Sequence, residues 1–213
     1  MVEPDSELLY FADPMCSWCW GFLPTVERLA AQYEARAPVS VVMAGLHCGT
    51  QKALEPGMKD TIRCHWDRVR EASGQPFDAT FFDRVGFVYD TEPSCRAVVA
   101  ARRIVEASAL PVLARLHRAF YAENRDITDE GTIIALVAEH LGLSETRFAD
   151  VFQDDETLLE TDGDFQLARE LGVRRFPTLL ARSGCALTVI TEGFSPFDRV
   201  AEPLAACFEG AAE

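Results

Sequence analysis

Two thiols one helical turn apart, in the segment Cys16-Ser17-Trp18-Cys19, lie between a short apolar run and a helix-like stretch. Residues 7–12 predict a buried strand, and residues 16–35 carry apolar side chains at helical spacing. The free backbone N–H groups at a helix start stabilise an anion, so Cys16 is expected to react as a thiolate. Cys19 could then attack a mixed disulfide formed at Cys16. The motif thus indicates a disulfide-exchanging dithiol, while half of a zinc site or two packed core thiols remain open as alternatives.

The composition narrows the class of protein. The chain has 213 residues, of which 48% are hydrophobic, and a net charge of −14, which is typical of a soluble globular protein and argues against nucleic-acid binding. No apolar stretch is long enough to span a membrane, and the first residues lack the basic and apolar regions of a signal peptide. Without an export signal, the seven cysteines are expected to be mostly reduced. The sequence therefore predicts a cytoplasmic location.

The order of the expected elements indicates an α/β fold with an insertion. A second β-branched run at residues 39–43 completes a strand–helix–strand unit, which should be parallel. From about residue 50 to 160 the pattern is helical, with Asp129 and Ser144 as expected helix caps, and a further helix is expected at residues 162–171. Residues 178–181 and 187–190 predict a hairpin, followed by a terminal helix. We therefore expect a domain made of residues 1–49 and 160–213, with an all-helical insertion at residues 50–159.

Three segments of the chain resemble the DsbA family, and within it the cytosolic protein-disulfide isomerase branch related to FrnE-type oxidoreductases. These segments are Phe11-Ala12-Asp13-Pro14-Met15-Cys16-Ser17-Trp18-Cys19-Trp20-Gly21-Phe22, Thr91-Glu92-Pro93-Ser94-Cys95-Arg96-Ala97 and Gly172-Val173-Arg174-Arg175-Phe176-Pro177-Thr178. The resemblance covers nearly the whole chain. It implies a thioredoxin-like fold interrupted by a helical domain, and thiol–disulfide oxidoreductase or isomerase activity.

The resemblance also implies roles for individual residues. Cys16 is the expected nucleophile and Cys19 the resolving thiol. Pro177 is expected in the cis form, so that the backbone of Phe176 is presented to a substrate segment beside the cysteine pair. No bound cofactor and no metal are expected. The expected partners are protein or small-molecule thiols and disulfides, with glutathione or the thioredoxin system as candidate redox partners.

Several neighbours of the motif are candidates for supporting or substrate-binding roles. Arg174 and Arg175 could stabilise the Cys16 thiolate or hold the carboxylates of glutathione or an acidic substrate, although a solvated loop pair is the simpler interpretation. Trp18 offers an aromatic rim for apolar substrate segments, and Ser17 helps to set the direction of exchange. The strand segment Leu8-Leu9-Tyr10-Phe11 carries no acid, so Asp13, or water, is the candidate proton acceptor.

The other five cysteines carry weaker signals. Cys95 and Cys207 follow helical apolar patterns and are expected to be core residues. Cys185 follows the expected hairpin turn and should be exposed. His47-Cys48 and Cys64-His65 could nominally contribute to a zinc site, or Cys48 and Cys64 could form a second redox pair.

Two other functions remain as alternatives. The first is a glutathione-binding kappa-type transferase or isomerase on the same fold, against which the intact cysteine pair speaks. The second is a non-enzymatic zinc-binding or thiol-chaperone module.

Overall fold

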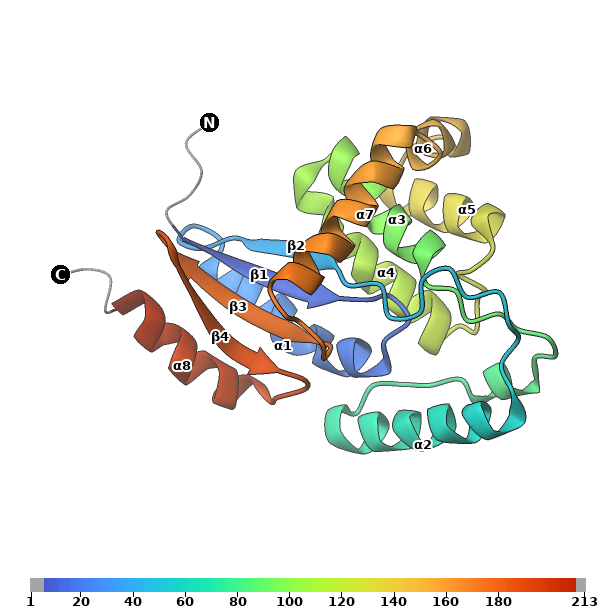
Figure 1. Ribbon diagram of the computed structural model, residues 1–213, viewed down its shortest axis with the longest axis horizontal. Coiled ribbons are helices and arrows are strands. Elements are labelled where there is room, and N and C mark those ends of the chain that lie inside the picture. The colour runs from blue at the N-terminus through green and yellow to red at the C-terminus, as the bar shows by residue number, and fades with distance from the viewer. Residues whose placement is uncertain (1–5, 210–213) are drawn as a thin grey trace.

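A four-stranded sheet forms the centre of the computed structural model, which describes residues 6–209 (Figure 1). Its strands are β1 (Ser6–Ala12), β2 (Val39–Met43), β3 (Thr178–Ser183) and β4 (Ala186–Glu192), in the order β2-β1-β3-β4. β1 pairs in parallel with β2 and antiparallel with β3, and β3 pairs antiparallel with β4. The expected strand–helix–strand unit and hairpin are therefore confirmed. Expectations about residues 1–5 lie outside the described residues.

Helices cover both faces of this sheet. The part of the sequence between β2 and β3 is mostly helical. The α-helices are α1 (Ser17–Tyr33), α2 (Pro56–Ser73), α3 (Glu92–Ile104), α4 (Ala109–Tyr121), α5 (Glu130–Leu141), α6 (Glu145–Phe152), α7 (Asp155–Glu170) and α8 (Phe197–Glu209), with short 3₁₀ helices at Ala79–Asp83 and Glu106–Ser108. α7 begins earlier than the helix expected at residues 162–171, because Asp154 caps it by accepting a hydrogen bond from the Glu156 amide. α7 thus crosses the expected domain boundary at residue 160.

Alternation along β1 divides the sheet between two groups of helices. Leu8 and Tyr10 point to the face that packs against α1, in the main hydrophobic core. Leu9 and Phe11 point to the other face, where they form a smaller core with Ala168 of α7. Figure 1 shows α7 crossing the sheet on that side, with α1 on the opposite side and α8 beside β3 and β4.

Helix α2 lies near the start of α1 (Figure 1). A cluster of aromatic side chains holds it in place. Trp66 of α2 is buried, with its ring 4.8 to 5.2 Å from those of four neighbours, Phe77, Phe81, Phe82 and Tyr121. Contacts of this kind between aromatic rings each contribute about 0.5–1.5 kcal/mol beyond the burial of their area. The cluster therefore gives α2 a fixed position opposite the thiol motif.

None of the helices within residues 6–209 is both long enough and apolar enough to cross a lipid bilayer.

Candidate active site

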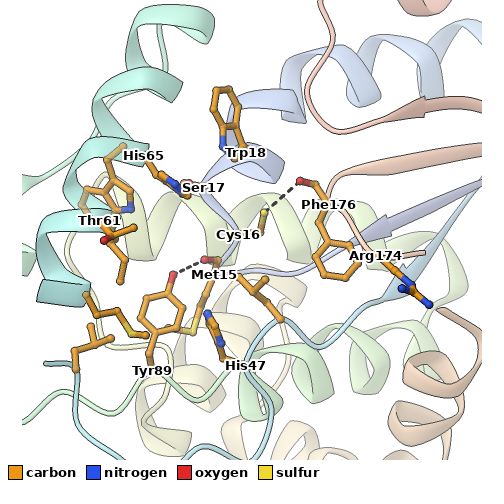
Figure 2. Close-up of a pocket in the computed structure, with 15 residues that line it drawn as sticks. Met15, Cys16, Ser17, Trp18, His47, Thr61, His65, Tyr89, Arg174 and Phe176 are labelled. Carbon is orange, nitrogen blue, oxygen red and sulfur yellow. Dashed lines mark hydrogen bonds between the residues drawn. The ribbon is translucent and has the colours of Figure 1, made fainter. Parts of the chain in front are cut away.

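Cys16 is the residue immediately before α1. Its backbone is extended (φ −88°, ψ 112°), and no side chain caps the first turn of the helix. The amides of that turn and the positive end of the helix dipole therefore face the position of the Cys16 sulfur. Only 6% of the residue is exposed, and its Sγ donates a long hydrogen bond of 3.8 Å to the carbonyl oxygen of Phe176 (Figure 2). Cys16 is thus held between a helix start and the loop before β3.

Cys19 lies one turn further along α1 and is fully buried. Burial raises the pKa of the Cys19 thiol well above its ordinary value, and the neighbouring Cys16 thiol adds to this shift. The two thiols are within hydrogen-bonding reach of each other. One sulfur of the pair therefore lies at the surface of the site, and the other lies in a water-poor interior where its proton is hard to remove.

Asp13 is a buried acid close to Cys19. It is fully buried and accepts hydrogen bonds from the amides of Met15, at 2.8 Å, and Leu46, at 2.7 Å. Burial raises the pKa of Asp13, although these two amide hydrogen bonds oppose the shift. The backbone of Asp13 also hydrogen-bonds to Cys19. The site therefore contains an acid, with a pKa moved upward, next to the buried thiol.

His117 of α4 supports the loop that leads into the thiol motif. The side chain is fully buried, and its Nδ1 lies 3.0 Å from the carbonyl oxygen of Pro14, to which it donates. Burial lowers the pKa of His117 to about 3, so the imidazole is neutral at physiological pH. A neutral histidine thus fixes the backbone at Pro14, two residues before Cys16.

This buried histidine predicts a measurable loss of stability in acid. Because the unfolded chain binds a proton near the ordinary pKa of 6.5 whereas the folded chain does not until about 3, the free energy of unfolding should fall as the pH drops between these values. The expected slope is about 1.4 kcal/mol per pH unit. Denaturant titrations of the wild type and His117→Gln should show this slope in their difference. His65→Gln, at an exposed histidine, is the control; a pH-independent difference for His117→Gln would contradict the account.

A cavity of about 330 Å³ opens in front of Cys16. It is bounded by the start of α1, by α2, by the loop after β2 and by the loop before β3. Its lining comprises Met15, Cys16, Ser17, Trp18, Leu46, His47, Leu54, Met58, Thr61, Ile62, His65, Trp66, Tyr89, Arg174 and Phe176. Figure 2 shows Thr61 and His65 of α2 across the cavity from Phe176 and Arg174, with Cys16 between them. Most of these side chains are apolar, so the cavity can take an apolar segment beside the thiol.

The structure brings most of the candidate residues together. Cys16, Ser17, Trp18, Arg174 and Phe176 line the cavity, while Cys19 and Asp13 lie beneath it. The Phe176–Pro177 peptide bond is cis. Trp18 is half-buried because its ring packs 5.6 Å from that of Phe194. Of the two arginines, Arg174 lines the cavity, and Arg175 is exposed and lies outside that lining.

Several site residues carry no sequence signal for this role. Met58, Thr61 and Ile62 of α2 line the cavity, but their helical spacing does not indicate which cavity they face. His47 and His65 were candidate zinc ligands, and both line the cavity. Tyr89 is buried behind them and donates a hydrogen bond from its hydroxyl to the carbonyl oxygen of Met15 (Figure 2). Within residues 6–209, no group of three or more cysteine, histidine or acidic side chains is arranged to hold a metal ion.

Comparison with known proteins gives the same class as the fold and the site. The model of the DSBA-like thioredoxin domain matches residues 7–204, and the chain belongs to this family. Its architecture is a DsbA-type thioredoxin fold.

Solved structures refine this placement. A protein of Nitrosomonas europaea, assigned provisionally as a protein disulfide isomerase, is 36% identical, with a TM-score of 0.90 over 96% of this chain and 98% of that one. The cytosolic disulfide reductase DsbM of Pseudomonas aeruginosa is 27% identical, with a TM-score of 0.78 over 95% of this chain and 99% of that one. DsbM has also been solved with glutathione (GSH). The family and these neighbours support thiol–disulfide oxidoreductase chemistry.

Curated relatives match more distantly. The ClpXP adapter protein SpxH of Bacillus subtilis is 21% identical over 81% of this chain. The match covers 57% of that protein, so the chain spans little more than half the length of this relative.

Proposed function

We propose that the chain is a cytoplasmic thiol–disulfide oxidoreductase in which Cys16 is the nucleophile and Cys19 the resolving thiol. The observation that carries this proposal is the asymmetry of the pair. Cys16 lines the cavity at an uncapped helix start, whereas Cys19 is fully buried behind it. An incoming disulfide can therefore reach one sulfur only, and the helix start stabilises that sulfur as a thiolate.

The proposed exchange has two steps. The Cys16 thiolate attacks one sulfur of a substrate disulfide, forms a mixed disulfide and releases the other substrate sulfur as a thiolate. Cys19 then loses its proton and attacks the Cys16 sulfur, which releases the second substrate thiol and leaves a Cys16–Cys19 disulfide. The backbone of Phe176, beside Cys16, is the proposed docking edge for an extended substrate segment. In the opposite direction, the oxidised pair donates its disulfide to a substrate dithiol.

Asp13 is the proposed proton acceptor in the second step. Cys19 is hard to deprotonate because it is buried, and the Asp13 carboxyl group is buried beside it. A general base of this kind typically contributes about 10²–10⁴-fold to a proton-transfer step. The base works only when it is ionised, so resolution should become faster as the pH rises through the raised pKa of Asp13.

The Asp13→Asn variant tests this proton transfer. We expect resolution at neutral pH to slow by about 10²-fold, and the rate to recover only at high pH, where solvent removes the Cys19 proton. Stopped-flow release of glutathione from a preformed Cys16–glutathione mixed disulfide measures this step, and thermal unfolding checks that the fold is kept. A variant with the wild-type pH profile would remove Asp13 from the mechanism.

Glutathione disulfide, or a disulfide that contains glutathione, is the substrate class that we favour. The cavity of about 330 Å³ is at the lower end of the range of small-ligand sites, and Arg174 on its rim can pair with a carboxylate. The structure of DsbM with glutathione supports this choice. Isomerase activity on protein substrates is the second candidate, supported by the Nitrosomonas neighbour. A kappa-type transferase is less well supported, because the site keeps both thiols of its pair.

The adjacent arginines provide a matched test of glutathione recognition. Arg174→Ala should raise the KM for glutathione disulfide about threefold to tenfold, because a charge-assisted hydrogen bond at the rim is lost. Arg175→Ala removes the same charge from the neighbouring exposed position, outside the cavity lining, and should leave the KM nearly unchanged. Steady-state reduction of glutathione disulfide compares the two. Equal effects would show that the arginines act through general charge.

A further inference from the structure

A second pair of thiols, Cys48 and Cys95, lies near Asp13, with which the Cys95 sulfur is in contact. Cys48 is in the loop after β2, and Cys95 is in the first turn of α3. The two side chains are neighbours, because the Cys48 thiol contributes to the raised pKa of Cys95. The helical apolar pattern around Cys95 predicts a core residue, and the sequence offers a zinc site or a pair with Cys64 as roles for Cys48. The fold instead brings Cys48 to Cys95.

The loop that carries Cys48 is fixed to the start of α3. The amide of His47 donates to the hydroxyl of Thr91 at 3.2 Å, and the amide of Gly49 donates to Asp90 at 2.9 Å. The Cys48 sulfur itself lies 3.5 Å from the Thr91 hydroxyl oxygen. Because Cys95 follows Thr91 by one helical turn, these contacts hold the two thiols on one face of α3.

Gly45 allows the Cys48 sulfur to point inward, although Cys48 as a whole is exposed. Gly45 has φ +66°, and a Cβ atom added there would lie 2.9 Å from the Cys48 sulfur. Such a contact is too close for any side chain, so the loop backbone makes room for this sulfur. The backbone conformation of the loop at Gly45 therefore allows Cys48 to approach Cys95.

The two thiols differ in the same way as Cys16 and Cys19. Cys48 is exposed and reachable from solvent, whereas Cys95 is fully buried. The Cys95 sulfur donates to Asp13 Oδ2 at 3.5 Å, so a proton acceptor is already in contact with it. Burial raises the pKa of Cys95, with Cys48 adding to the shift, so Cys95 needs that acceptor in order to react.

We propose that Cys48 and Cys95 form a second dithiol–disulfide couple, which is oxidised by glutathione disulfide or a disulfide of similar chemistry. The Cys48 thiolate attacks one sulfur of glutathione disulfide, whose S–S bond breaks and releases the first glutathione thiolate. Cys95 then transfers its proton to Asp13, and its sulfur attacks the Cys48 sulfur and displaces the second glutathione thiolate. Both thiolates take up the protons that the cysteines have given up. The two cysteines lose two electrons, and one glutathione disulfide becomes two glutathione molecules.

This couple shares Asp13 with the first pair. In the reduced state the carboxyl group accepts a hydrogen bond from Cys95 while it lies beside Cys19. Formation of a Cys48–Cys95 disulfide removes that hydrogen bond and ties the loop that carries His47, a cavity residue, to α3. The redox state of the second couple therefore acts on the surroundings of the first.

The test uses a full-length Cys16→Ser/Cys19→Ser variant, so that its outcome does not depend on the proposed function. The reduced variant is incubated with glutathione disulfide, the remaining thiols are alkylated, and the peptides are mapped by mass spectrometry. We expect a peptide pair joined by a Cys48–Cys95 disulfide. Cys64 and Cys185, the matched exposed cysteines, should carry only glutathione adducts.

A further Cys95→Ala substitution should leave Cys48 as a stable glutathione adduct. Decay of the Cys48 adduct should be at least about tenfold faster when Cys95 is present. The proposal is overturned if Cys48 retains its adduct and Cys95 stays a free thiol, as at an isolated cysteine. The same map of the wild-type chain decides the matter if the double variant does not fold.

Discussion

The Cys16→Ser variant should lose thiol–disulfide exchange at the Cys16–Cys19 pair almost entirely, by about 10³-fold or more. A serine hydroxyl is not ionised at neutral pH and does not attack a disulfide sulfur, so the first step has no nucleophile. The substitution is nearly isosteric, and the fold should remain intact. Alkylation and peptide mapping of Cys19, after the prereduced variant has been incubated with glutathione disulfide, measure the loss at this pair separately from any reaction of Cys48.

The control for this variant is Cys185→Ser. Cys185 is an exposed thiol in the turn between β3 and β4, away from the cavity lining, and its replacement should leave the exchange rate unchanged. If Cys16→Ser kept more than about one tenth of the wild-type rate, another thiol would be the nucleophile. Cys48 would then be the first to examine, because it too is exposed and lies beside His47 at the cavity.

The Cys19→Ser variant should stop after the first step and accumulate a mixed disulfide. Cys16 still attacks, but no buried thiol is available to displace the substrate. Incubation with glutathione disulfide should therefore give one glutathionyl group on Cys16 in nearly every chain, and turnover by the dithiol route should cease. Peptide mapping measures the adduct at Cys16 separately from adducts on exposed cysteines, with Cys16→Ser as the control that cannot form it. Full dithiol oxidase turnover by Cys19→Ser would contradict the resolving role.

The elements of the fold could be predicted largely from the sequence, because their signals are local. The short apolar run at residues 7–12 and the β-branched run at residues 39–43 predict strands, and the parallel pairing follows from the helix between them. Asp129 and Ser144 cap α5 and α6, as their positions before apolar helical patterns indicate. The start of α7 was missed because the expected helix was placed on its later, apolar part, and its acidic first turn was not recognised.

The burial of residues behind the cavity depends on contacts between distant parts of the chain, which no local sequence pattern indicates. Asp13 lies in a short loop after β1, and such a residue is usually exposed. It is fully buried because the amide of Leu46 and the thiol of Cys95 close over its carboxyl group. These partners come from distant parts of the chain. For the same reason, the helical pattern around Cys95 predicted burial but not the thiol that it meets.

The different positions of the two arginines could not be predicted from the sequence. Arg174 and Arg175 are adjacent and equally charged, and the sequence gives no reason to separate them. The turn into β3 directs only Arg174 into the cavity lining. The distinction arises from backbone geometry at the loop.

The central claim is that Cys16 and Cys19 interconvert as one dithiol–disulfide couple, and a redox titration tests it most directly. The purified chain is equilibrated in glutathione buffers, and tryptophan fluorescence and thiol trapping at Cys16 follow its state. The account predicts one reversible two-electron transition at this pair. A potential of about −120 to −180 mV would mark an oxidant or isomerase, and one near about −270 mV a reductase. The absence of a reversible Cys16–Cys19 disulfide at any glutathione ratio would contradict the account.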